Sequence, residues 1–262
     1  MKQIRSRDNP LFKSLLRLAK SDKVRHANHM MLLDGDHLIE ACRNTGVRIS
    51  ILAIAESVLQ QTSKRELFES TLADMRLVLA DQLLGAISPV VTASGLVAVA
   101  PIPAPEPFPV TAQTCLMLDA IQDPGNLGTI LRTAVAAGIR HAALSPRCAS
   151  AWGPKSIRAG MGAHFQISIH EHADLPSLLG RYQGLSIATR PDARLSLYEA
   201  ELSAPVAWLF GNEGAGLSLE LSSHAQSAVR IPMPGPTESL NVACAVAICL
   251  FEQLRQTKAV MP

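Results

Sequence analysis

A proline-rich segment divides this chain into two halves. The stretch PIPAPEPFPVTA (101–112) holds five prolines in twelve residues. Because proline fixes φ and has no backbone N–H, such a stretch builds neither a helix nor a central strand and favours an extended spacer. We therefore expect a first domain over residues 1–100, a linker over 101–112 and a second domain over 113–262.

The composition limits the kind of protein that these halves can form. Of 262 residues, 48% are apolar and 18% are charged, which is enough to bury a core in each half. Aromatic residues make up 4%, which argues against a sheet that stacks many nucleic-acid bases. The formal net charge is only +2, so any basic footprint for nucleic acid has to be local.

Cysteine usage and the distribution of apolar residues indicate a cytoplasmic protein. The five cysteines are scattered and include no C-x-x-C pair, which excludes a disulfide scaffold or a zinc ribbon. The N-terminus lacks an apolar signal segment, and the longest uncharged stretch (82–105) is broken by proline and glycine, so no membrane span is expected. His170 and His172 form the closest histidine pair without a third ligand, so we expect no metal site.

Short apolar runs alternate with amphipathic segments in both halves. In the first half we expect helices over 9–20, 36–44 and 64–73, with strands over 29–33, 48–55, 76–79 and 96–100. In the second half we expect strands over 115–118, 141–144, 165–169, 185–188, 206–210 and 228–231, with a last helix over 239–257. This alternation predicts an α/β protein whose second half has a mainly parallel sheet covered on both faces.

Three polar, glycine-rich loops follow predicted strands of the second half. They are DAIQDPGNLGTILRTA (119–134), GNEGAGLS (211–218) and PMPGPTESLN (232–241). Ligands of such sheets bind beyond the carboxyl ends of the strands, so these loops mark a candidate site. The second loop is neither a P-loop, since no G-K-[ST] follows, nor a dinucleotide fingerprint, since its glycine spacing differs.

A helix is predicted to begin in each of two of these loops. Asn126 is predicted to cap the first helix, in which Gly128 stands four residues before Arg132. An arginine on a helix usually faces solvent, but a glycine in the first turn costs about 1 kcal/mol relative to alanine, which indicates close approach of a ligand near Arg132. Ser239 is predicted to cap the last helix, which is apolar on nearly all sides, as expected of a core helix or a subunit interface.

Together these loops resemble the SpoU–TrmH family of RNA 2′-O-ribose methyltransferases, in the SPOUT superfamily. The resemblance covers residues 113–258 approximately and is carried by three motifs: Asn126, Gly128 and Arg132; Gly211, Asn212, Glu213, Gly216 and Leu217; and Ile231, Pro232, Met233, Glu238, Ser239, Leu240, Asn241 and Val242. A looser resemblance to that family's substrate-binding domain, a small α/β fold related to a ribosomal protein, rests on IRSRDNPLFK (4–13) and DGDHLIEA (34–41).

The resemblance implies a fold and a reaction. The fold is a SPOUT α/β-knot, that is, a mainly parallel sheet with a deep trefoil knot, preceded by the small RNA-binding domain. The reaction transfers a methyl group from S-adenosylmethionine to a ribose 2′-hydroxyl of structured RNA, with rRNA favoured over tRNA and without a metal. The resemblance also implies a homodimer formed through the catalytic domain.

It further implies roles for individual residues. The donor would be bound by Leu209, Gly211, Asn212, Ile231, Met233 and Leu240, and the catalytic residues would be Arg132, Asn126, Glu213, Ser239 and Asn241. RNA would contact Arg5, Arg7, Lys13 and Arg17, in a run (2–25) with eight Lys or Arg, and also Lys155 and Arg158. Arg132 is either the base for the 2′-hydroxyl or, since a guanidinium is effectively always protonated, a clamp on the adjacent phosphate.

Other interpretations stay open at this point. Gly160 stands where the family often has serine, which puts any substrate contact of that serine in doubt. A non-catalytic RNA-binding or assembly protein would keep the fold and bind the donor without transferring a methyl group. A nucleotide-dependent oxidoreductase would need a G-x-G-x-x-G after the first strand of its sheet, which this chain lacks.

Overall fold

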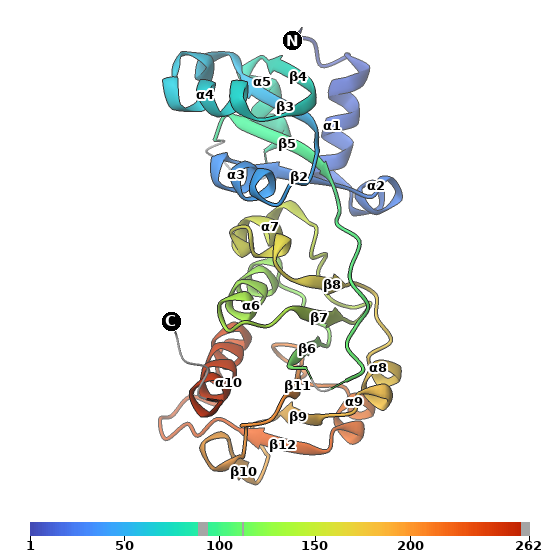
Figure 1. The fold of residues 1–262 in the computed structure, drawn as a ribbon, viewed down its shortest axis with the longest axis vertical. Helices are drawn as coiled ribbons and strands as arrows, with labels where there is room; N and C mark the ends of the chain where they lie inside the picture. The colour runs from blue at the N-terminus through green and yellow to red at the C-terminus, as the bar shows by residue number, and fades with distance from the viewer. Residues whose placement is uncertain (89–93, 112, 258–262) are drawn as a thin grey trace. The chain divides into compact units, whose positions relative to one another are not determined.

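The chain forms two compact units in a computed structural model that describes residues 1–88, 94–111 and 113–257 (Figure 1). The first unit comprises Met1–Ala104 together with Trp152–Phe165, and the second comprises Pro105–Ala151 and the chain from Gln166 onward. One segment from the second half of the sequence therefore packs with the first unit. That segment carries helix α7 (Pro154–Gly160), which lies against strand β2 (Met30–Asp34).

The first unit has a mixed five-stranded sheet. Its strands in spatial order are β1 (Lys2–Ile4), β4 (Ala73–Leu79), β3 (Ile49–Ala55), β5 (Leu96–Pro101) and β2. The first three run parallel, and β5 is antiparallel to both of its neighbours. Its helices are α1 (Pro10–Lys20), α2 (Asp22–Asn28), α3 (Asp36–Asn44), α4 (Thr62–Ser70), α5 (Asp81–Ile87) and α7, with 3-10 turns η1 (Glu56–Gln60) and η2 (Ala163–Phe165).

Helix α1 shows why these elements form where they do. The Asn9 side chain accepts a hydrogen bond from the Leu11 amide, and Pro10 occupies the first turn, where its missing N–H costs nothing. Phe12, Leu15 and Leu18 then recur at helical spacing and are buried. The sequence predicted this helix, whereas it did not predict β1, α2 or α5, each of which is seven residues or shorter.

The second unit has a seven-stranded sheet in which every pair is parallel. Its strands in spatial order are β10 (Leu195–Ser196), β12 (Ser227–Arg230), β9 (Leu185–Thr189), β11 (Val206–Phe210), β6 (Cys115–Leu118), β7 (His141–Leu144) and β8 (Ser168–His170). Its helices are α6 (Pro124–Ala136), α8 (Leu175–Arg181), α9 (Leu219–His224) and α10 (Val242–Gln256), with the 3-10 turn η3 (Leu197–Glu199).

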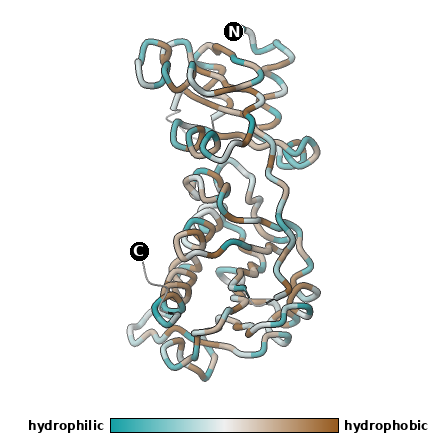
Figure 2. Tube along the Cα trace, in the orientation of Figure 1, coloured by the Kyte–Doolittle hydropathy of each residue, from teal (hydrophilic) through white to brown (hydrophobic). Residues whose placement is uncertain are grey.

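The central strands of this sheet are buried along their whole length, as a parallel sheet covered on both faces requires. Figure 2 shows the tube brown along much of these strands. The prediction of an α/β fold with a parallel sheet in the second half is confirmed. The trefoil knot implied by the resemblance stays a prediction.

Two helices of the second unit are capped by residues other than those predicted. Helix α6 is capped by Asp123, whose carboxylate accepts from the Asn126 amide at 2.7 Å, so Asn126 lies inside the first turn and its side chain is left for other contacts. Helix α10 starts at Val242 and is capped by Asn241, which accepts from the amides of Ala243 and Cys244, and not by Ser239. In both cases a cap with good geometry lies a few residues from the predicted one.

Helix α10 is buried on one side in the single chain, and its other side, although largely apolar, is partly exposed. Val246, Cys249 and Leu250 face the core, whereas Cys244 is exposed and Phe251 retains 45% of its accessible surface. In the described residues no helix is both long and apolar enough to cross a membrane.

A buried polar network anchors α10 to the sheet. The Gln253 side chain accepts a hydrogen bond from Trp208 Nε1 at 2.7 Å and donates to Thr114 Oγ1 and to the Ala204 carbonyl. Trp208 is fully buried in β11, so no water replaces a lost partner.

We expect Gln253→Ala to destabilise the protein by about 2–4 kcal/mol, because it leaves the indole N–H unpaired in the core and opens a cavity. Thermal unfolding followed by circular dichroism measures this loss. Glu66→Ala, at an exposed position of helix α4, is the control and should change the melting temperature little. Equal melting temperatures for Gln253→Ala and the wild type would contradict an anchoring role for this network.

Candidate active site

Four neighbouring parallel strands, β12, β9, β11 and β6, end at one edge of the second sheet, and the three predicted loops meet there. A pocket of about 210 Å³ lies at the ends of the first three of these strands. It is lined by Thr189, Arg190, Pro191, Phe210, Gly211, Asn212, Glu213, Gly214, Gly216, Val229, Ile231, Met233, Ser239, Leu240, Val242 and Ala245.

The loop after β11 is a closed turn. The backbone of Asn212 and that of Gly216 exchange two hydrogen bonds of 2.9 Å, and the Asn212 side chain accepts from the amides of Gly214 and Ala215. A Cβ on Gly211 would lie 2.2 Å from the backbone of Gly216, so only glycine fits at this position. The result is a tight backbone wall on one side of the pocket.

Asn126 joins the three loops. Its Nδ2 donates to Glu213 Oε1 at 3.0 Å, and its Oδ1 accepts from Asn241 Nδ2 at 2.9 Å. One side chain at the start of α6 thus connects the loop after β11 with the cap of α10. Because the Asp123 side chain caps α6, the Asn126 side chain does not have to cap this helix. Its Oδ1 and Nδ2 can therefore both make these bonds.

The segment after β6 is hydrogen-bonded to the loop after β11. Asn212 Nδ2 donates to the carbonyl of Ala120, whose backbone has a positive φ of 57°. A non-glycine residue in that conformation is strained, and such strain gathers at functional sites. The loop between β6 and α6 is therefore held in a fixed shape against the turn at Asn212.

Asp119 is a buried carboxylate beside the same turn. Its Oδ2 accepts from the Ser218 amide at 3.1 Å, and Arg147 lies 3.4 Å from its Oδ1. Burial by itself raises the pKa of Asp119. The net shift is downward, because the carboxylate accepts hydrogen bonds from the Ser218 and Ser145 hydroxyls and from the Ser218 amide, and because it lies near the charge of Arg147. The ionised side chain positions the end of the loop where α9 begins.

Most residues predicted to form the site lie together. The pocket lining includes five predicted donor-binding residues (Gly211, Asn212, Ile231, Met233 and Leu240) and two predicted catalytic residues (Glu213 and Ser239). Asn126 and Asn241 are hydrogen-bonded to this group. Leu209 does not line the pocket, because its side chain is buried in the core and its carbonyl accepts from Thr189 Oγ1. Arg132 is exposed on α6 and is not in the lining.

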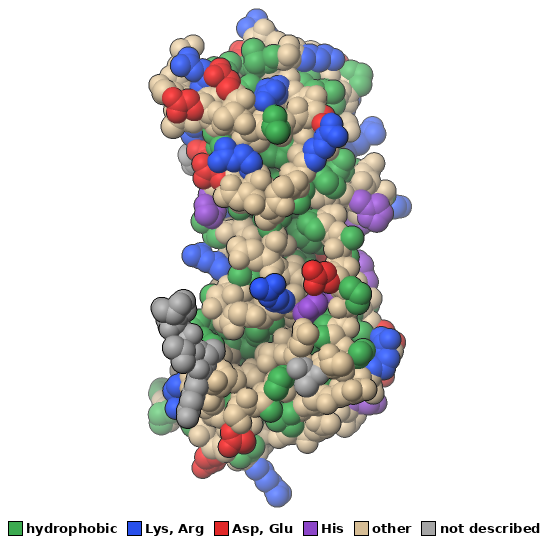
Figure 3. All heavy atoms as spheres, in the orientation of Figure 1, with side chains coloured by type: hydrophobic (Ala, Val, Ile, Leu, Met, Phe, Trp, Pro, Cys, Tyr) green, Lys and Arg blue, Asp and Glu red, His purple; other side chains and the backbone are tan. Residues whose placement is uncertain are grey.

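All six residues predicted to contact RNA belong to the first unit and are exposed. Lys155 and Arg158 do so because α7 packs with that unit. Three of the six form ion pairs: Arg5 with Glu56, Lys13 with Asp8, and Arg158 with the buried Asp34. Figure 3 shows Lys and Arg side chains spread over the visible face of the first unit with no single dense patch.

The sequence reasoning missed the segment after β9. Thr189, Arg190 and Pro191 line the pocket, and the Arg190 guanidinium is held by Asp192 and the Ser222 hydroxyl. The strand pattern could have indicated this segment. Strand β9 runs parallel to its neighbour β11, so the residues after the carboxyl end of β9 lie at the same edge of the sheet as the loop after β11. Among the residues that the structure describes, no group of three or more His, Cys, Asp or Glu side chains is arranged to hold a metal ion.

A fully parallel sheet with a glycine-walled pocket at its carboxyl edge defines a ligand-binding α/β domain. The sequence profile of the SpoU rRNA Methylase family matches residues 113–251. An uncharacterized tRNA/rRNA methyltransferase of Synechocystis sp. is 35% identical over 97% of this chain and 93% of its own length. The 23S rRNA (guanosine(2553)-2′-O)-methyltransferase RlmP of Bacillus subtilis is 32% identical over 96% of this chain and 98% of its own length.

The fold agrees with these sequence matches. The crystal structure of an AdoMet-bound rRNA methyltransferase from Sinorhizobium meliloti superposes with a TM-score of 0.80 at 28% identity, covering 97% of each chain. This chain belongs to the SpoU rRNA methylase family.

Proposed function

We propose that this chain transfers the methyl group of S-adenosylmethionine to a ribose 2′-hydroxyl of RNA, and that its substrate is rRNA. The observation that carries the proposal is the Asn126 bridge, which joins all three family motifs around one pocket. The relatives support it, since the Bacillus subtilis protein acts on 23S rRNA and the Sinorhizobium meliloti protein was solved with AdoMet.

The pocket suits the methyl donor. Ile231, Met233 and Leu240 supply apolar side chains that would enclose an adenine ring, and the backbone at Gly211 supplies polar groups at close range. When bound there, S-adenosylmethionine supplies a methyl group on a positively charged sulfur. The Glu213 carboxylate, held by Asn126, is a suitable neighbour for such a charge.

The remaining motif residues would serve the acceptor. Asn126, Ser239 and Asn241 lie where the loops meet and would shape the entrance for the ribose. Arg132 stands outside the donor pocket, which suits a role on the RNA side. A guanidinium there would clamp the phosphate next to the 2′-hydroxyl and stabilise negative charge on that oxygen as its proton leaves.

The first domain (1–100), connected through the linker (101–112) to the catalytic domain (113–262), would hold the RNA. Arg5, Arg7, Lys13 and Arg17 would contact phosphates together with Lys155 and Arg158. The ion pairs of Arg5 and Lys13 do not oppose this role, because exposed pairs contribute little and a phosphate can replace the carboxylate. We place the reaction in the cytoplasm, where a bacterial rRNA substrate is found.

We further propose a homodimer formed through the catalytic domain. Cys244, Ile248 and Phe251 recur at helical spacing on the less buried side of α10, which gives the helix a second apolar face. Phe251→Glu should convert the dimer to a monomer in light scattering coupled to size exclusion, because it buries a charge at the interface. A wild-type monomer at micromolar concentration would contradict the proposal.

Labelled S-adenosylmethionine and RNA from a strain that lacks the gene test the proposed function. We expect label in a 2′-O-methylnucleoside of rRNA, and mapping that nucleoside identifies the substrate position. Donor binding without transfer to any RNA would favour the non-catalytic RNA-binding protein. Absence of donor binding would contradict the methyltransferase itself.

A further inference from the structure

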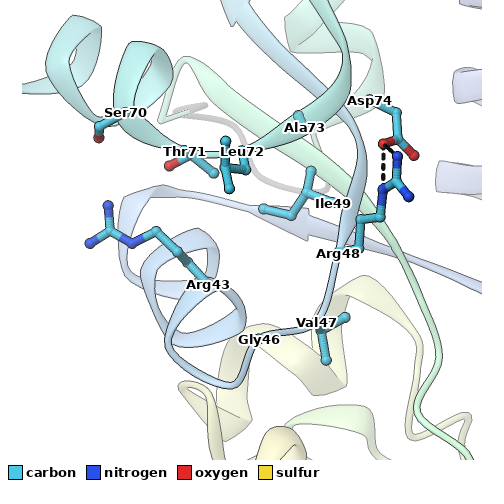
Figure 4. Close-up of a pocket in the computed structure, with 10 residues that line it drawn as sticks. All are labelled: Arg43, Gly46, Val47, Arg48, Ile49, Ser70, Thr71, Leu72, Ala73 and Asp74. Atoms are coloured by element: carbon cyan, nitrogen blue, oxygen red, sulfur yellow. Dashed lines mark hydrogen bonds and ion pairs between the residues drawn. The ribbon is translucent and has the colours of Figure 1, made fainter.

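Two features outside the donor pocket stand out, a cavity in the first unit and a pair of histidines in the second. The cavity has a volume of about 530 Å³ (Figure 4). Its charged side chains are the exposed Arg43 and an ion pair of Arg48 with Asp74, and the Thr71 hydroxyl is closed off from the open space. These groups do not build a ligand site, whereas the histidines are buried beneath part of the linker.

Strands β7 and β8 place the two histidines on one face of the second sheet. His141 begins β7 and His170 ends β8, and Ala143 lies directly opposite His170 in this parallel pair. Side chains two residues apart on a strand point to the same face, so Ala143 shares a face with both histidines. Because alanine is small, a side chain from another segment can pack over it.

That side chain is Phe108, from the proline-rich linker. The centre of its ring lies 6.2 Å from that of His141 and 5.4 Å from that of His170, and both contacts are edge to face. Phe108 also packs against the apolar core cluster that contains Ala143 and Leu175. One ring of the linker thus covers both histidines.

Hydrogen bonds hold the same stretch of linker on the sheet. The Ser168 hydroxyl donates to the carbonyl of Glu106 at 3.3 Å, and the Gln183 amide donates to the carbonyl of Val110 at 3.0 Å. Pro109, between them, is buried. Residues 106–110, here called the strap, are therefore bound to the second unit along their length.

The docked strap leaves no place for a second proton on either histidine. His141 Nδ1 and His170 Nε2 are buried and have no hydrogen-bond partner in the described part of the chain. A neutral imidazole has one N–H and one lone pair, whereas a protonated ring carries a charge and donates from both nitrogens. A buried charge whose N–H finds no acceptor is costly, so the docked strap favours the neutral rings.

The charges around the histidines act in the same direction on balance. Burial lowers the pKa of His141 below its ordinary value of 6.5, the Glu106 carboxylate raises it in part, and the Arg140 charge lowers it further. Burial also lowers the pKa of His170, and so does the nearby His141, while a hydrogen bond with the Glu106 backbone opposes the shift. Both rings are therefore harder to protonate under the strap than in water.

The other titratable groups nearby do not compensate a charge on these rings. Tyr182 and Cys115 belong to the core cluster that Phe108 covers, and burial raises the pKa of each, so both stay neutral. Glu171, which follows β8, accepts from the Ala151 amide at 2.7 Å, and Asp174 caps α8. Their carboxylates are already engaged in holding the backbone.

We propose that the strap and the two histidines form an acid-sensitive contact, docked while both rings are neutral and released when they take up protons. Docking is fully present above pH about 6.5, the ordinary value for histidine, and weakens as the pH falls below it, because the released state binds protons that the docked state excludes.

Release would change how the two units are connected. The chain passes between them at three places, 104–105, 151–152 and 165–166, and the strap follows the first of these. A released strap lengthens the free proline-rich connection there, so the first unit is held less tightly to the second. The inference goes beyond the proposed function and does not depend on it.

Hydrogen exchange of the Gln183 amide in the full chain tests the release, because this amide donates to the strap. After correction for the intrinsic exchange rate, we expect its protection factor to fall about tenfold or more between about pH 7.5 and about pH 5.5. The Asp119 amide, which donates to the carbonyl of Phe210 in the same sheet, is the internal control and should keep its protection. Unchanged protection of Gln183 at the lower pH would overturn the proposal.

Phe108→Ala tests whether the strap is what keeps the protons out. NMR titration of the ring protons should place the midpoints of His141 and His170 below 6.5 in the wild type and closer to 6.5 in this variant. Leu178→Ala, which trims a partly buried side chain on the same core cluster, is the matched control and should leave both midpoints at their wild-type values.

The outcomes separate clearly. Wild-type midpoints at or above 6.5, or equal midpoints in the wild type and a folded Phe108→Ala, would contradict the proposal. If Phe108→Ala does not fold, the wild-type exchange and titration still decide. None of these measurements uses RNA or S-adenosylmethionine, so their result is independent of whether the chain transfers a methyl group.

Discussion

Arg132→Ala is expected to lower the rate of methyl transfer by roughly 10²–10³-fold while leaving the affinity for S-adenosylmethionine nearly unchanged. The reason is its position: Arg132 is exposed on α6 and is not among the residues that line the donor pocket. In the proposed mechanism its guanidinium would hold the phosphate of the RNA and would stabilise developing negative charge. Single-turnover transfer to rRNA and calorimetric titration with the donor measure the two quantities separately.

Arg140→Ala is the matched control, because Arg140 is also an exposed arginine of the second unit and is outside the donor pocket. It should transfer the methyl group at close to the wild-type rate. Loss of donor binding in Arg132→Ala would instead place Arg132 in the donor site, and an unchanged rate would remove it from the mechanism.

Arg132→Lys separates the two roles considered for the arginine. As a clamp, lysine keeps the charge but not the bidentate geometry, so partial activity with little dependence on pH is expected. As a base, a lysine amine would gain activity as pH rises through its own titration. The pH profile of this variant therefore decides between a clamp and a base.

The sequence predicted which loops meet at one sheet edge better than it predicted the ends of the elements around them. The sequence pattern placed the three loops at one sheet edge, because the carboxyl ends of parallel strands lie at the same edge. This inference holds even where the predicted ends of the strands are off by a residue or two. It could not place Asn126, because two candidate caps, Asp123 and Asn126, stand three residues apart and only the backbone geometry selects between them. With Asp123 as the cap, the Asn126 side chain bonds to Glu213 and Asn241 instead.

Contacts between distant segments could not be predicted either. Nothing in the sequence pairs Trp208 with Gln253, or places α7 against β2. The apolar pattern of α10 was visible, but one sequence cannot say which apolar side faces the core and which stays partly exposed. The trefoil knot stays beyond pattern reasoning, since threaded chains are too rare to be expected from strand order.

Gly211→Ala is expected to weaken binding of S-adenosylmethionine by about 100-fold or more, and methyl transfer with it. An added Cβ would lie 2.2 Å from the carbonyl carbon of Gly216 and from the amide nitrogen of Leu217. Both atoms belong to the backbone, so no side chain can move aside. The turn would have to open, which breaks the paired hydrogen bonds between Asn212 and Gly216 that form the pocket wall.

Gly214→Ala is the matched control within the same turn. Its added Cβ would meet only Asn212 Oδ1, at 3.7 Å, which is an ordinary contact. Donor affinity should therefore fall only a few-fold, because the turn keeps its shape. Calorimetric titration of both variants, with circular dichroism to confirm that each is folded, measures the difference. If Gly211→Ala binds the donor as well as Gly214→Ala does, the closed turn at Asn212 is not what shapes the donor site, and the pocket must be formed mainly by the apolar residues that follow β12.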